Sequence, residues 1–282
     1  MNPSLVDRAI ALLNVRLSGA GRPESDLDPL SRAEVFVRYS RDPKSLRGVD
    51  LSGVDLRRAN LTGADLTGSN LRDANLSCAD LRGACLSGTN LSGCNLESAD
   101  LTGADVHDAN WLRHGTDGRP VRLRNASAAG ANFLGTNLVR ADLTRADLHN
   151  ANLGEANLNS ADLTGATLER ADLHGANLRH ATLIGAFLDG ADLGTADLTR
   201  ARCSGADFTA AVLRRANLVE ADLSDSDLTS ADLTEALLCD ADLRNARLGA
   251  VILKDTDIEG VRLDGADLSQ TDLTGARNVP LR

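Results

Sequence analysis

A leucine that returns every five residues is the feature that most constrains how this chain folds. Between residues 141 and 178 it is preceded two places earlier by a small residue, usually alanine, and is usually preceded directly by Asp or Asn. The leucines of this stretch are Leu143, Leu148, Leu153, Leu158, Leu163, Leu168, Leu173 and Leu178. On an α-helix a step of five advances the direction by ~500°, so the leucines would scatter around the axis. In a straight strand an odd step sends successive leucines to opposite faces.

Every leucine nevertheless has the same neighbours, so every leucine should have the same environment. A chain that bends once per unit and winds into a coil meets this condition. We expect each unit to turn its leucine and alanine inward, and to turn the Asp or Asn and the two following residues toward solvent. Stacked coils would then share backbone hydrogen bonds at the sheet spacing of ~4.8 Å. Aromatic residues are only 2% of the chain, which favours a narrow aliphatic interior.

The repeat divides the chain into five segments. We predict an N-terminal helical segment over residues 1–45, a first repeat tract over 46–111, a loop over 112–122, a second repeat tract over 123–275 and a tail over 276–282. In residues 1–45, Ser4 with Asp7 and Ser31 with Glu34 have the spacing of helix starts. These helices either cover the open apolar end of the coil, which we favour, or form a small interaction module.

The phase of the repeat breaks after Trp111, which lies twelve residues before Leu123, where ten would keep register. The intervening Gly and Pro residues favour a loop that protrudes from the rod. Four arginines against one aspartate make residues 112–124 a basic island on an acidic chain. The candidate contact residues of this island are Arg113, His114, Arg119, Arg122 and Arg124. The alternative is a tolerated surface insertion without a function.

Two further sets of outward residues are candidates for contact with a partner. Apolar residues stand at a few outward positions, where they form either a dimer patch or scattered surface apolarity: Ile184, Phe187, Val212, Leu237 and Ile252. Aspartates one coil apart form a candidate acidic surface: Asp207 with Asp227, and Asp222 with Asp242. Two carboxylates on a flat face make a poor cage for a cation, so we expect no metal site there.

Charge and motifs argue against several classes of function. The net charge is −10, and residues 1–45 hold seven basic and six acidic side chains, which leaves about −11 for residues 46–282. Such a rod repels nucleic acid phosphates and anionic membranes. The chain contains no Walker loop, no G-x-S-x-G and no H-E-x-x-H motif, so we expect no enzyme and no cofactor. The five cysteines have no disulfide-like or zinc-like spacing, and no long apolar run is present, so we expect a reducing, cytoplasmic location.

The unit of alanine, Asp or Asn, leucine and two variable polar residues resembles the pentapeptide repeat family. The resemblance covers about residues 46–111 and 123–275. It implies an all-β fold, a right-handed quadrilateral β-helix with four units per coil, here with a short N-terminal helical segment. Some members of that family are similar to B-DNA in width, shape and acidity, and bind type II topoisomerases. The resemblance therefore implies a protein partner, with DNA gyrase or topoisomerase IV as the candidates, and a homodimer as one expected assembly.

Two functions remain open at this point. The first is a DNA mimic that binds a type II topoisomerase and modulates or protects it, as quinolone-resistance members of the family do. The second is a generic protein-interaction scaffold with an unrelated partner. A DNA mimic should lose binding as salt rises, whereas a scaffold should depend on Phe187, Ile252 or the N-terminal helices.

Overall fold

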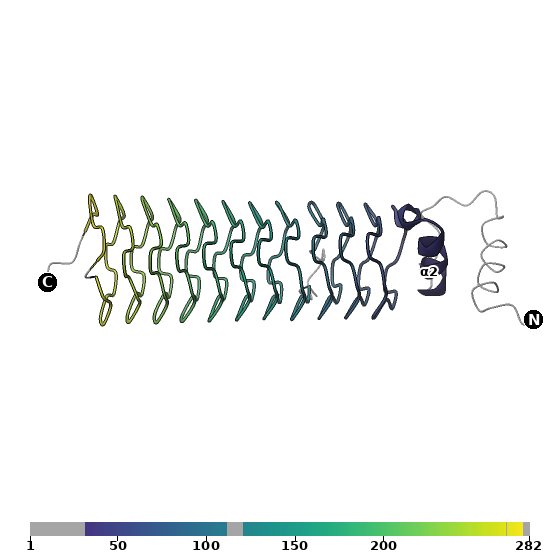
Figure 1. Cartoon of the computed structure of the whole chain (residues 1–282), viewed down its shortest axis with the longest axis horizontal. Coiled ribbons are helices and arrows are strands. Elements are labelled where there is room, and N and C mark those ends of the chain that lie inside the picture. The colour runs from purple at the N-terminus through teal and green to yellow at the C-terminus, as the bar shows by residue number, and fades with distance from the viewer. Residues whose placement is uncertain (1–31, 112–120, 269, 279–282) are drawn as a thin grey trace, which may run out of the picture.

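The computed structural model describes residues 32–111, 121–268 and 270–278. They form a long rod in which flat coils of the chain stack along one axis, with helix α2 at the N-terminal end (Figure 1). The helix that the sequence predicts after Ser4 lies outside the described residues.

The rod is held together by parallel pairing between residues twenty positions apart. Asp142 pairs with Asp162, and Asp162 pairs in turn with Thr182. Because a pair starts at every fifth residue and closes after twenty, each coil contains four five-residue units. In the described part of the chain the pairs are isolated bridges of single residues, and no strand of several residues is formed.

Most units repeat the same backbone hydrogen bonds. The Leu143 N–H donates to the carbonyl of Asp162 on the next coil, with 2.7 Å between nitrogen and oxygen. The Asp142 N–H donates to Val121 on the preceding coil at 3.0 Å, and the Ala146 N–H closes a turn onto the Leu143 carbonyl at 3.0 Å. The bend required by the period of five is therefore a four-residue turn from one leucine to the next alanine.

The Asp or Asn of each unit stabilises the turn that follows it. The Oδ1 of Asp142 accepts the Thr144 N–H at 3.1 Å, and Asp162 accepts the Thr164 N–H at 3.0 Å. The residue after Thr144 is Arg145, whose φ is 56°, in the left-handed region that this kind of turn requires. A short side chain that accepts the N–H two residues later is the usual means of fixing such a bend. The expectation that these side chains simply face solvent is therefore wrong, because most are half-buried and bonded to their own turn.

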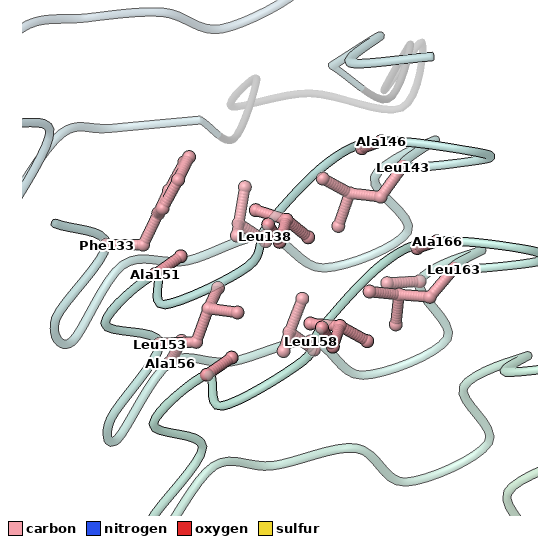
Figure 2. Close-up of a cluster of buried hydrophobic side chains, with 14 of the residues drawn as sticks. Phe133, Leu138, Leu143, Ala146, Ala151, Leu153, Ala156, Leu158, Leu163 and Ala166 are labelled. Carbon is pink, nitrogen blue, oxygen red and sulfur yellow. The ribbon is translucent and has the colours of Figure 1, made fainter. Parts of the chain in front are cut away.

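The core is a set of stacked leucine and alanine columns. Leu143 and Leu163 lie above one another on neighbouring coils, as do Ala146 and Ala166, and all are at most 1% exposed (Figure 2). Phe133 and Phe208 replace leucine in the columns and are also fully buried. Burying one such large apolar side chain contributes roughly 1.5–3 kcal/mol, so these columns dominate the stability of the rod.

The predicted break in register is real, but its length differs from the expectation. Asn95 pairs with Arg122, twenty-seven residues away instead of twenty, so seven residues are inserted into this coil rather than two. Leu123 therefore belongs to the unit that directly follows Trp111. The loop is also shorter at its C-terminal end than predicted, because Val121 is already buried and Arg122 is already paired.

The N-terminal end of the rod is covered by two short helices, α2 (Arg32–Arg41) and the 3-10 helix η2 (Pro43–Leu46). Val35 of α2 is fully buried against the first coil. The Tyr39 hydroxyl donates to the Thr62 carbonyl at 2.6 Å. The helix predicted after Ser31 is confirmed, and its contacts are those of a cap. Neither described helix has the length and apolar character needed to cross a lipid bilayer.

Candidate interaction surfaces

The stacking of coils aligns the paired residues into four rows that run along the rod. Row 1 extends from Asp55 to Arg262, row 2 from Asn60 to Asp267, row 3 from Asp65 to Asp272 and row 4 from Asp50 to Arg277. Each paired residue is followed by a leucine and two turn residues, and we count these two turn residues with the row. Because the chain passes through the rows in order, rows 2 and 3 are neighbours and row 1 is opposite row 3.

Charge is distributed unequally over these rows. Among the described residues, row 1 holds eight acidic and eight basic side chains, and row 4 holds seven acidic and five basic. Row 2 holds eight acidic side chains against three basic, and row 3 holds ten against three. The negative charge of the rod therefore lies almost wholly on two adjacent rows.

The acidic side chains of rows 2 and 3 are least compensated near the middle of the rod. Six of them make no ion pair in the described part of the chain, and we call these six the central acidic patch: Glu155, Glu169, Asp172, Asp189, Asp192 and Asp207. Arg170 is the one arginine or lysine on these rows between the first and last of them. Phe187 lies in row 2 within the patch and has 48% of its surface exposed.

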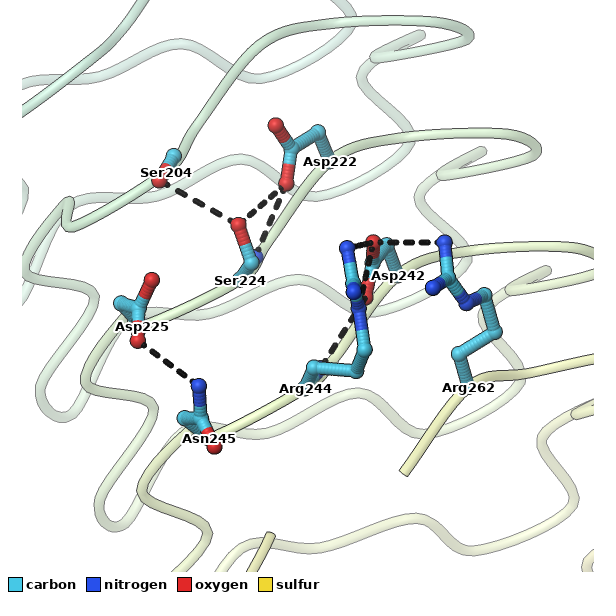
Figure 3. Close-up of polar contacts among 8 residues, drawn as sticks. All are labelled: Ser204, Asp222, Ser224, Asp225, Asp242, Arg244, Asn245 and Arg262. Atoms are coloured by element: carbon cyan, nitrogen blue, oxygen red, sulfur yellow. Dashed lines mark hydrogen bonds and ion pairs between the residues drawn. The ribbon is translucent and has the colours of Figure 1, made fainter. Parts of the chain in front are cut away.

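Row 1 differs in its composition, because its eight carboxylates are balanced by eight arginines, some of which pair with them directly. Asp242 accepts from Arg244 on its own coil and from Arg262 on the next, with nitrogen–oxygen distances of 2.7 and 3.1 Å (Figure 3). The hydrogen bond from Arg244 is the main cause of the lowered pKa of Asp242. Asp222 is bonded instead by Ser224, at 2.6 Å. Such pairs lie at the surface with the arginine exposed, so each contributes little to stability, and the equal numbers of arginines and carboxylates cancel the charge of the row.

The candidate acidic residues are therefore divided between two environments. Both predicted pairs are formed, since Asp207 pairs with Asp227 and Asp222 with Asp242. The first pair lies in acidic row 2 and the second in neutral row 1. In the described ranges, no group of three or more His, Cys, Asp or Glu residues is arranged to hold a metal ion.

The predicted apolar patch is not assembled. Ile184 lies in row 1, Phe187 in row 2, Val212 and Ile252 in row 3, and Leu237 in row 4. These residues therefore point to all sides of the rod. Even Val212 and Ile252 are separated by the intervening Asp232, with which both pair.

The basic island is described only in part. Arg113, His114 and Arg119 lie outside the described residues. Arg122 and Arg124 belong to row 1, where the Arg124 guanidinium pairs with Asp142 at 3.2 Å. These two arginines thus contribute to the neutral row as well as flanking the insertion.

Comparison with protein families gives one clear match. A model described as pentapeptide repeats matches in overlapping copies that together span residues 45–110 and 121–277. No curated protein sequence matches this chain.

Solved structures of other repeat proteins also match this chain, but they superpose on it with low TM-scores. HetL, a pentapeptide repeat protein involved in heterocyst differentiation regulation in the cyanobacterium Nostoc, is 31% identical, with 88% of this chain and 96% of that chain covered and a TM-score of 0.36. Full-length QnrB1, a plasmid-mediated fluoroquinolone resistance protein, is 17% identical, with 74% and 90% covered and a TM-score of 0.31. A pentapeptide repeat protein of the Arabidopsis thaliana thylakoid lumen is 30% identical, with 45% and 70% covered and a TM-score of 0.22.

Proposed function

The chain belongs to the pentapeptide repeat family, and from this premise we propose that it is a non-enzymatic binding protein whose acidic rows dock on a basic protein surface. We infer that its coil is the right-handed, four-sided β-helix found in the family's known structures. The pairing of residues twenty apart, with four units per coil, supports this inference.

The partner that fits these rows best is a type II topoisomerase, either DNA gyrase or topoisomerase IV. Its DNA-binding surface is basic, and rows 2 and 3 offer it a straight, negatively charged edge. The observation that supports this proposal is the segregation of charge, with eighteen acidic and six basic side chains on rows 2 and 3 and equal numbers on row 1. A protein that needed acidity only for solubility would have no reason to neutralise one side.

The proposal assigns distinct roles to the two sides of the rod. Rows 2 and 3 contact the enzyme in place of DNA, and row 1 faces away from it. No nucleic acid, membrane or cofactor takes part, and the protein acts in the cytoplasm with its partner. A homodimer and a modulating role for loop 112–122 stay predictions.

The test compares two triple variants that change the net charge equally, one on rows 2 and 3 and the other on row 1. The first is Glu155→Lys, Glu169→Lys and Asp189→Lys, on rows 2 and 3. The matched control is a row 1 set at turn positions of the same kind: Glu97→Lys, Asp225→Lys and Asp264→Lys. All six replaced residues lie outside the bridge position, so the side chains that fix the turns are kept.

Binding to purified gyrase is then measured at two salt concentrations. We expect the first triple variant to bind at least tenfold more weakly, and the control to bind within about threefold of the unmodified protein. Binding of the unmodified protein should weaken as salt rises, because exposed charges are screened over ~10 Å at 0.1 M salt. Equal losses in both variants would refute the assignment of sides.

An interaction scaffold with an unrelated partner is the second candidate, and the exposed Phe187 favours it. An aromatic side chain that is 48% exposed is a common anchor in protein interfaces. Phe187→Ala distinguishes the two candidates. If it abolishes binding to a captured partner while the charge variants leave that binding unchanged, the scaffold replaces the DNA mimic.

A further inference from the structure

A positively charged cavity lies where helix α2 meets the first coils, on the neutral row of the acidic rod. Its volume is about 470 Å³, and it is lined by Arg32, Asp55, Arg57, Arg58, Ser77 and Cys78. Three guanidinium groups therefore face one carboxylate. The cavity is far along the rod from the central acidic patch and takes no part in the proposed docking.

Two of the three arginines are held in place. Arg32 donates to the carbonyls of Asp55 and Arg57, both at 2.8 Å, and its guanidinium also lies 5.2 Å from the centre of the Phe36 ring. Arg57 binds the Asp55 carboxylate through two nitrogens, with Nε–Oδ1 at 2.9 Å and a terminal nitrogen–Oδ2 contact of 2.6 Å. These contacts fix the lining of the cavity in advance of any ligand.

The Asp55 carboxylate is already bound within this network. The hydrogen bond from Arg57 is the main cause that lowers the pKa of Asp55 to about 2, so the group is ionised at neutral pH. Its single charge offsets one of the three guanidinium charges, which leaves an excess of about two positive charges at the cavity.

Arg58 is the side chain that this network leaves free. Its backbone has a φ of 56° and its N–H donates to the Ser77 carbonyl at 3.0 Å, which places it beside Ser77 and Cys78 of the next coil. No hydrogen bond or ion pair joins its guanidinium to any described residue. The Ser77 hydroxyl adds a second donor at the same wall.

We propose that this cavity binds a phosphate group, either as inorganic phosphate or as a phosphomonoester. A dianionic phosphate matches the excess charge, and its oxygens match the planar fork of a guanidinium. The free donors of Arg58 and Ser77 would bind it, with Arg32 and Arg57 supplying the surrounding positive field.

The test uses the full chain labelled with ¹⁵N and follows the arginine and serine amide signals during titration. The probes are inorganic phosphate and phosphoserine, with sodium chloride at equal ionic strength as the blank and acetate as a carboxylate control. The variant is Arg58→Gly, which suits a positive φ. The matched control is Arg145→Gly, at the equivalent turn position of the same row, where φ is also 56°.

We expect saturable shifts at Arg58 and Ser77 with either phosphate probe, unchanged by Arg145→Gly and weakened roughly 10- to 100-fold by Arg58→Gly, the range for losing a charged hydrogen-bond partner. Saturation by phosphoserine alone would identify a phosphomonoester as the ligand. The proposal is overturned if the shifts with both phosphate probes are no larger than those of chloride, if acetate binds equally well, or if both variants bind alike. Gyrase binding is a separate measurement, so either proposal can fail alone.

Discussion

Replacing one central leucine tests whether the stacked column stabilises the rod. Leu163 is 0% exposed and lies between Leu143 and Leu183 of the adjacent coils. Leu163→Ala removes buried methyl groups and leaves a cavity that the rigid neighbouring coils can fill only in part. Substitutions of this kind cost about 2.7–5 kcal/mol, and we expect the upper half of that range here, because coils above and below fix the spacing.

The assay is guanidinium unfolding followed by far-UV circular dichroism, with two control variants. Thr164→Ala removes an exposed hydroxyl that bonds only to Asp162 in its own turn, at 2.6 Å, and should change the free energy of unfolding by less than about 0.5 kcal/mol. Leu273→Ala, in the last described coil, where the leucine is partly exposed, should cost about half as much as Leu163→Ala. The unfolding free energies of the variants can be compared directly if m, the slope of the free energy against denaturant concentration, is the same in all of them. A cost for Leu163→Ala no greater than that for Thr164→Ala would refute the column.

Three further outcomes follow from the described contacts. Cys78 and Cys85 are exposed, whereas Cys94 and Cys203 are fully buried. Burial disfavours the thiolate and therefore raises the pKa of the two buried thiols. A disulfide reagent should modify the first two quickly and the last two only after unfolding; fast reaction of all four would contradict the packing. Hydrogen bonding from Arg82 is the main cause that lowers the pKa of Asp80 to about 2, so this carboxylate stabilises the fold above its unfolded pKa of 3.8, and that stability is lost as the pH falls through about 2. Titration by carbon NMR should give this midpoint, and an unchanged midpoint in Arg82→Ala would show that the hydrogen bond is not the cause. Finally, Gly93→Ala should destabilise more than Gly103→Ala, since φ is positive at both but only the first Cβ would meet a neighbouring side chain, at the Oδ1 of Asp73; equal melting temperatures would contradict this.

The repeat alone predicts the inside of the rod well. The period of five requires a bend in each unit, and the leucine and alanine positions are buried as expected, as Leu143 and Ala146 illustrate. The helix after Ser31 was also predictable, because Glu34 lies at the spacing of a helix start and Pro43 follows soon after.

The outside of the rod was predicted less well, for two physical reasons. A period of five does not by itself say how many units make a coil, so the rows of Phe187 and Leu237 could not be assigned from spacing alone. Counting in fives also cannot tell whether Leu123 belongs to the first or the second unit after Trp111, which is why the insertion was underestimated. The local role of Asp142 was readable in principle, because Asp and Asn are the residues that fix such turns.

The most direct test of the proposed function is a DNA supercoiling assay with purified gyrase, titrated with this protein with and without a quinolone at two salt concentrations. The unmodified protein and the row 1 triple variant should inhibit supercoiling or protect the enzyme from the quinolone at micromolar concentration, and the effect should weaken as salt rises. The triple variant of rows 2 and 3 should have little effect. No effect of the unmodified protein at high excess, or equal activity of both variants, would contradict the claim that the acidic rows replace DNA on the enzyme.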